Sequence, residues 1–596
     1  MNLTGLDWTI IAAFFGISLL VGTLVAKRAS RSMEEFFLSG RNMPWWLLGV
    51  SMVATTFAID TPNLVTNIIR QNGVAGNWVW WAFLLTGMLT VFVYARLWRR
   101  SGVTTDLEFY ELRYSGRSAA FLRGFRALYL GVFFNVMIMA NVCLAAIKLG
   151  NIVLGLSPLQ TLVLASLITV IYSSAGGLRG VIITDFIQFG LAMLGSIWAA
   201  TLIVGMPQVG GLDNLLAHPN VSGKLNLLPD FDDRTMLVSV FIVPLAVQWW
   251  SIWYPGSEPG GGGYVAQRML SARNERHAVG ATLFFNLAHY ALRPWPWILI
   301  ALASLVVFPD LEALRQSFPD VAPGLIQDDI AYPAMLGFLP HGVLGLLIAS
   351  LAAAFMSTIS THLNWGSSYV VNDFYKRFIN PEAGQRQQVR IGRISTVVLM
   401  VLAGAVALVL ESALQAFSIL LAIGAGTGLI FILRWFWWRI NAATEIAGMI
   451  ISFLVAVFFE FGYQRLGFEP LAGHVQLVAS VGVTTVLWLA VTLLTPPTDD
   501  ETLQQFYRLV RPAGPGWARV RAQLLATGAD RAEIDAEGSL TRGIRNFVIG
   551  SFTVYFWLFG FGYMLYGRAV TGLILLGLAT AGMVFLIRQI IATRSA

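Results

Sequence analysis

Two stretches, ATTFAIDTPN at residues 54–63 and WYPGSEPGGGGY at residues 253–264, interrupt long apolar segments of this chain. Each stretch places a carboxylate, Asp60 or Glu258, where a membrane-spanning helix would cross the bilayer. Unpaired polar groups are costly at that depth and are tolerated only around a cavity. A proline kink in a packed helix would account for Pro62 alone, but not for the glycine run. Paired interruptions of this kind indicate the substrate site of a secondary transporter.

The composition independently predicts a membrane protein. Hydrophobic residues make up 56% of the chain and charged residues 12%, whereas soluble domains carry about 25% charge. The net charge of +7 comes from basic residues in short loops between apolar runs, which is the pattern of membrane orientation. We therefore expect a lipid bilayer around the apolar surface and no nucleic-acid partner. The single cysteine, Cys143, excludes an intrachain disulfide.

Apolar runs of the required length predict about fifteen membrane spans. They are centred near residues 16, 57, 88, 137, 167, 192, 246, 294, 352, 400, 425, 453, 485, 556 and 581. The basic cluster Lys27, Arg28 and Arg31 follows the first run, so this run is no cleavable signal peptide and the amino terminus should face outward. Alternation then places the carboxyl terminus inside. We expect a multi-pass protein of a bacterial inner membrane.

A stripe of hydroxyl side chains marks the span near residue 352. In LAAAFMSTISTHLNW, Ala354, Ser357, Thr358 and Thr361 fall on one helical face. Such hydroxyls often satisfy carbonyls of their own helix or join neighbouring helices. Beside the freed carbonyls of a broken helix, they are also ligands for a small cation. The stripe leaves both roles open.

Asp185, in GGLRGVIITDFIQ, is a second anionic point within an apolar segment. A charge near a helix centre costs on the order of 3 kcal/mol, so it requires a partner or a function. One alternative is an ion pair with a nearby arginine such as Arg179. The other is a second cation site shared with Ser360 and Thr361, and the two can hold in different states.

Five stretches, in order along the chain, resemble the sodium:solute symporters, a family that includes sodium-coupled sugar, proline, sialic acid and pantothenate carriers. They are EEFFLSGRNMPWWLLGVSMVATTFA (34–58), SSAGGLRGVIITDFIQ (173–188), VAQRMLSARNERHA (265–278), LAAAFMSTISTHLNWGSSYVVNDFYKR (351–377) and FWWRINAATEIAGMI (436–450). Together they extend the resemblance from about residue 7 to about residue 495. One such motif would carry little weight, but five in register are specific.

The resemblance implies an all-α polytopic membrane protein with a five-plus-five inverted repeat of the leucine-transporter type. It implies an extra amino-terminal helix and loop (1–43), a transport core (44–438) and two accessory helices (439–495). The remaining segments are a cytoplasmic linker (496–545) and a carboxyl-terminal transmembrane hairpin (546–596). No resident cofactor is expected beyond sodium ions, and the oligomeric state is left open.

The resemblance also implies two sodium sites. The first would use carbonyl and hydroxyl oxygens of Ala54, Phe57, Ala354, Ser357 and Thr358. The possible second site would use Asp185, Ser360 and Thr361. Both sets of residues are present in this chain.

The implied solute pocket departs from the pattern of the sugar carriers. Trp253 and Tyr254 resemble the aromatic pair that gates sugar, yet the acidic sugar contact becomes Asn77 and a glutamine becomes Phe417. The candidate solute residues are Asp60, Thr61, Asn77, Trp253, Tyr254 and Glu258. The two carboxylates would also suit a cationic or amino-acid-like solute, and the aromatics would also suit the lipid interface. Glu258 either faces the solute cavity or lies in a water-exposed insertion.

The function expected from these observations is sodium-driven uptake of a small polar organic solute, with a sugar or related solute favoured. A membrane solute sensor is a weaker alternative, because the linker is short and lacks a nucleotide-binding glycine loop. An enzyme is not expected, because the six histidines are scattered and no HExxH or CxxC motif occurs. A channel is disfavoured because the hydroxyl stripe builds closed ion sites.

Overall fold

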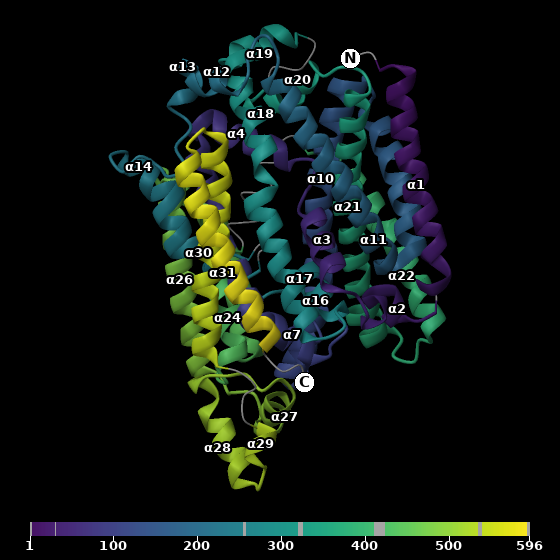
Figure 1. Ribbon diagram of the computed structural model, residues 1–596. Helices are drawn as coiled ribbons and strands as arrows, with labels where there is room; N and C mark the ends of the chain where they lie inside the picture. Colours follow the sequence, from purple (N-terminus) through teal and green to yellow (C-terminus); the bar gives the residue numbers. More distant parts are fainter. Residues whose placement is uncertain are drawn as a thin grey trace.

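The computed structural model describes residues 3–29, 31–253, 258–319, 326–410, 424–534 and 539–592. Helices account for 80% of it, and the described residues contain no strand (Figure 1). Ten described helices are long and apolar enough to cross a membrane, and shorter apolar helices occur at Gly5–Val21, Trp45–Thr55, Pro158–Ser174 and Ala442–Val457. The expected all-α polytopic architecture is confirmed.

Most predicted spans coincide with single helical segments. The span near residue 137 is Gly116–Leu149, the span near 294 is Glu275–Val307, and the span near 485 is Gly473–Leu494. The predicted spans near 167 and 192 instead join in α11 (Pro158–Val204), which is kinked at Gly177. Gly177 has φ +54°, and a Cβ there would lie 2.7 Å from the Phe36 carbonyl oxygen. Only glycine fits this close approach without strain.

The centre of the helix bundle is built around α11 and α21 (Val343–Ser368), which pack along each other. α1 (Gly5–Ala29) and α3 (Trp45–Thr55) also pack against α11. Nearly every residue of α21 is buried, whereas α1 leaves Leu6, Leu20 and Leu24 exposed along its outer side. The polar stripe of α21 therefore lies inside the protein, where lipid cannot reach it.

Both predicted interruptions are present. α3 ends at Thr55 and α4 (Thr61–Asn72) begins after Asp60. The helical segment that includes α15 (Trp249–Ser251) ends before residue 252, and α16 (Gly263–Ser271) begins at Gly263. Residues 254–257 lie outside the described part of the chain. The described residues on either side, 252–253 and 258–262, are not helical.

The segment after residue 495 contains short helices that pack beneath the bundle, followed by a terminal hairpin. α27 (Asp500–Val510) and α28 (Ala518–Ala526) bury Phe506 and Trp517, whose rings stack 5.4 Å apart. The Trp517 indole donates to the Trp435 carbonyl at 2.8 Å, which anchors the linker to the core. α30 (Leu540–Leu565) and α31 (Ala569–Ala592) then run side by side as an antiparallel hairpin (Figure 1).

Candidate functional site

The first interruption lies against the hydroxyl stripe of α21. The Thr358 hydroxyl lies 2.9 Å from the Thr55 carbonyl at the end of α3 and 3.1 Å from the Ala354 carbonyl of its own helix. One hydroxyl group therefore brings together carbonyls of α3 and of α21. Hydroxyls and unwound carbonyls that meet in this way are the ligand set for a small hard cation. Ala54 and Phe57 are both buried at the same interruption.

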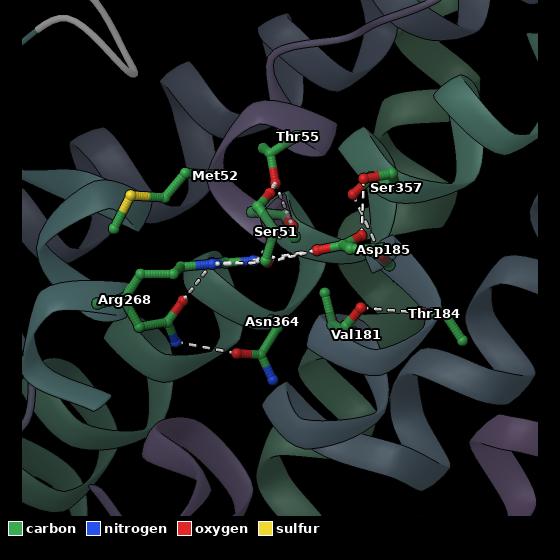
Figure 2. A network of polar contacts seen from close by, with 12 residues as sticks. Ser51, Met52, Thr55, Val181, Thr184, Asp185, Arg268, Ser357 and Asn364 are labelled. Carbon is green, nitrogen blue, oxygen red and sulfur yellow. Dashed lines mark hydrogen bonds and ion pairs between the residues drawn. The ribbon is translucent and has the colours of Figure 1, made fainter. Parts of the chain in front are cut away.

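Asp185 of α11 is the anionic centre of a buried polar network (Figure 2). Its Oδ1 accepts a hydrogen bond from the Ser357 hydroxyl at 2.7 Å, and its Oδ2 accepts one from Ser51 at 2.5 Å. Ser357 was expected at the first sodium site, whereas Asp185 was expected at the second. The structure thus joins the two predicted ligand sets through Ser357.

Arg268 of α16 supplies positive charge to this network. Its Nη2 lies 3.8 Å from Asp185 Oδ2, and both side chains are fully buried. The same nitrogen donates to the Thr361 hydroxyl at 2.7 Å, and Thr361 in turn contacts the Thr55 hydroxyl at 2.9 Å. In the described part of the chain, the ion pair of Asp185 is therefore with Arg268 of α16 rather than with an arginine of its own helix.

Arg268 touches two of the three residues predicted for the second sodium site. The third, Ser360, donates to the Ser357 carbonyl of its own helix at 3.1 Å. A buried arginine against a buried carboxylate is stable only while both remain paired. A cation bound at Asp185 would compete directly with this guanidinium.

The second interruption is held by residues distant in sequence. Ile252 forms an antiparallel bridge with Ala425, and the Trp253 amide donates to the Gly424 carbonyl at 3.3 Å. The Trp98 indole donates to the Gly260 carbonyl at 2.8 Å. At the start of α16, the Gly263 amide donates to the Asp106 carboxylate at 2.8 Å.

Glu258 is 4% exposed, so it is not a solvated residue in a water-exposed insertion. It lines a small cavity of about 10 Å³ together with Thr86, Thr90, Thr282 and Asn286. Each of the three threonine hydroxyls and the Asn286 amide nitrogen donates to a backbone carbonyl. The Asn286 amide oxygen is buried and has no hydrogen-bond partner among the described residues. Apart from the second N–H of Asn286, these groups therefore offer the cavity acceptors rather than donors.

The other predicted solute residues that the structure describes do not line this cavity. Asp60 precedes α4, and its buried Oδ1 has no hydrogen-bond partner in the described ranges; Thr61, the first residue of α4, is partly buried. Asn77 uses its amide locally, because its nitrogen donates to the Val74 carbonyl at 2.9 Å and its oxygen accepts from the Trp80 indole at 2.8 Å. The Trp253 ring is buried edge-on against Phe134. Tyr254 and Phe417 lie outside the described residues.

Sequence reasoning missed several residues of these networks. Ser51 and Thr55 lie one turn apart at the end of α3, a spacing that would have placed both on the face that meets α21. Arg268 was part of a recognised motif but was given no role. No role could be predicted for Asn286 from the sequence, because a single amide in an apolar segment usually forms hydrogen bonds between packed helices.

Comparison with known proteins agrees with this arrangement. The model of the sodium:solute symporter family matches residues 36–452. This chain belongs to the sodium:solute symporter family. A sodium/glucose cotransporter of Vibrio parahaemolyticus is 26% identical over 84% of this chain and 92% of its own length. A sodium/mannose cotransporter of Bos taurus is 28% identical over 79% of this chain and 81% of its own length.

A solved structure of a Na+-coupled sialic acid symporter, in a substrate-bound outward-open state, has the same fold. It superposes with a TM-score of 0.68 at 22% identity, over 84% of this chain and 99% of that one. The leucine-transporter-type fold expected from the sequence is thereby confirmed. The positions of the two interruptions are also those expected of this family's fold, at the first and sixth core helices.

Proposed function

We propose that this symporter couples inward sodium movement to uptake of a small polar organic solute that carries several hydroxyl groups, such as a sugar or polyol. The observation that carries the proposal is the meeting of the broken helix α3–α4 with the hydroxyl stripe of α21. The named activities of the sodium/glucose and sodium/mannose relatives support the same conclusion.

Sodium would bind first where the two helices meet. In the proposal, carbonyls of Ala54, Phe57 and Ala354 and the hydroxyls of Ser357 and Thr358 hold this ion. Filling the site fixes α3 against α21, and by linkage the solute and sodium raise each other's affinity equally. Asp185, Ser360 and Thr361 form the proposed second site, which a sodium ion occupies by displacing Arg268.

The cavity beside Glu258 supports the proposed solute class. A cavity whose side chains present acceptors favours a group that brings its own donor, and a solute hydroxyl does so. A cavity of about 10 Å³ has room for about one water molecule or one such hydroxyl. The same acceptors favour an ammonium group, so a cationic or amino-acid-like solute is the second candidate. Asp60, Thr61, Asn77, Trp253 and Tyr254 complete the proposed solute path.

The proposed location is a bacterial inner membrane, with the amino terminus outside and the carboxyl terminus in the cytoplasm. The basic loops and the linker helices α27 and α28 then lie on the cytoplasmic side. The five segments bounded at residues 43, 438, 495 and 545 remain our proposed division of the chain.

Uptake into liposomes that contain the purified chain tests this function. We expect accumulation of one or more radiolabelled hexoses or polyols only under an inward sodium gradient, with potassium as the matched control ion. Amino acids and betaines in the same panel test the second candidate. Failure of every solute to accumulate, or equal uptake under sodium and potassium gradients, would overturn sodium-coupled transport.

A further inference from the structure

A basic cavity of about 100 Å³ lies away from the transport site, at the end of the second core helix. It is enclosed by α7 (Ala95–Ser101), the first turn of α30, the last turns of α31 and the start of the loop after α27. Figure 1 shows the last turns of α31 close to α7. Its charged lining consists of Arg96, Arg100, Arg511 and Arg542.

Among the described residues, four arginines and no carboxylate line this cavity. Both oxygens of Glu275 accept from Arg100, at 2.9 and 3.1 Å. Arg96 lies near three other arginines, Arg100, Arg276 and Arg542, and the acidic Glu275 partly offsets their charge. Within the described ranges, neither Arg96 nor Arg542 forms a salt bridge with a carboxylate. Like charges held together in a partly buried site are stabilised by a bound anion.

The rest of the lining identifies the kind of anion. Guanidinium groups match phosphate oxygens with paired hydrogen bonds. Backbone N–H groups of the first turn of α30, which begins after Ser539, add partial positive charge at the same place. Between the arginines, the wall is apolar and includes Phe92, Leu97, Leu540 and Ile590. A soluble phosphate would make no favourable contact with this apolar wall, whereas the apolar part of a phospholipid would pack against it.

The cavity also adjoins the surface that faces lipid. On α30 and α31, next to the lining residues, Ile544, Ile587 and Ile591 are between 44% and 62% exposed. Apolar side chains at this exposure on membrane helices contact acyl chains. Basic pockets between transmembrane helices at the cytoplasmic side are typical binding sites for anionic lipid head groups.

We propose that this cavity binds the phosphate group of an anionic phospholipid, with Arg96 and Arg542 as its principal ligands. The bound lipid would connect the carboxyl-terminal hairpin to the transport core through α7. Assignment to the cytoplasmic leaflet rests on the proposed orientation, whereas the binding itself does not depend on that orientation or on transport.

Thermal unfolding of the full chain in detergent tests the proposal. We expect added phosphatidylglycerol to raise the melting temperature more than phosphatidylcholine does. Arg542→Gln should raise the phosphatidylglycerol concentration that gives half of the maximal stabilisation by about five-fold. This is the contribution expected of one basic residue near an anionic lipid surface. Arg542 is exposed, so its replacement should leave the fold intact. Arg96→Gln combined with Arg542→Gln should abolish the difference between the two lipids.

The matched control is Arg508→Gln, an exposed arginine on α27 that does not line the cavity. It should respond to phosphatidylglycerol as the unaltered chain does. Equal stabilisation by the two lipids, or an equal loss in Arg508→Gln, would overturn the site. Inorganic phosphate that stabilises the chain as strongly as phosphatidylglycerol would overturn the lipid assignment and identify a soluble anion as the ligand.

Discussion

The two interruptions differ in what holds them. The first spans only Thr56 to Asp60. The Thr56 and Phe57 amides bond to carbonyls of α3, while the side chains of His289 and Arg293 contact the Thr56 hydroxyl. The second contains a glycine run and is fixed by distant groups, among them the Trp98 indole and the Asp106 carboxylate. A break whose amide groups bond within its own helix keeps more of its shape when neighbouring helices move than a break whose backbone bonds mainly to distant groups.

This difference suggests that the two breaks have different roles in transport. The first break presents carbonyls of fixed geometry, which suits an ion whose ligands must converge within a narrow distance range. The second break connects α16 to α7 and to the residues before α24 (Gly428–Phe436), so it is placed to transmit movement between core helices. Arg268 links the two regions, since it extends from α16 to Ser51 and Thr361.

The largest expected effect is at the first break. Replacing Ser357 and Thr358 together by alanine removes two proposed sodium ligands while helix propensity is nearly unchanged. If each ligand contributes about 1.5 kcal/mol, as polar contacts to charged groups do, the apparent sodium affinity should fall more than about 100-fold. Sodium-driven uptake in liposomes measures this loss.

The matched control for that variant lies on the same helix. Ser367 and Ser368 are buried, and their hydroxyls donate to carbonyls of α21 itself. Replacing this pair by alanine should leave the sodium dependence of uptake unchanged. Unaltered sodium dependence in the Ser357 and Thr358 variant would remove both residues from the ion site.

A second effect tests the link between the two regions. Asp185→Asn removes the charge that Arg268 needs, and an unpaired buried arginine should destabilise the protein by roughly 3 kcal/mol. The apparent sodium affinity or the Hill slope of uptake should fall at the same time. Thermal unfolding and sodium titration of uptake measure the two consequences.

Combining Asp185→Asn with Arg268→Gln separates stability from ion binding. The double variant should recover most of the lost stability, because no unpaired buried charge remains. It should still lack the second ion effect. A wild-type Hill slope and sodium affinity in Asp185→Asn would return Asp185 to a purely structural role.

The outcome at these sites explains what sequence can predict. The breaks and the spans followed from composition, because unwound backbone and charge are tolerated in a membrane only at a few places. The central location of Asp185 followed for the same reason. Its partner did not follow from the sequence. Arg268 is 83 residues away, and it comes close because α16 packs against α3 and α21, which both pack against α11. Sequence spacing predicts faces of one helix, but not which faces of different helices meet.

A third and smaller effect concerns Glu258 at the second break. Glu258→Gln keeps the size of the side chain but converts one acceptor into a donor and removes the charge. We expect the half-saturating solute concentration to rise roughly ten-fold at fixed sodium, the loss expected of one charge-assisted hydrogen bond. Glu312→Gln, on the exposed surface, is the control. An unchanged value in Glu258→Gln would exclude this carboxylate from solute recognition.

The smallest expected effect is on the melting temperature, and it is tested by comparing two glycines of the second break. Gly260 has φ +78°, and a Cβ there would lie 2.6 Å from the Phe431 carbonyl oxygen. Gly260→Ala therefore combines left-handed strain of about 1–2 kcal/mol with a backbone clash, and it should lower the melting temperature by several degrees. Gly262 has an extended backbone with φ 179°, and its Cβ would meet only side-chain atoms, the nearest at 3.4 Å. Gly262→Ala should leave the melting temperature within about 1 °C of the original, because ordinary substitutions without strain change stability little. Equal melting temperatures for the two variants would mean that the anchoring of this break to the residues of α24 does not constrain its backbone.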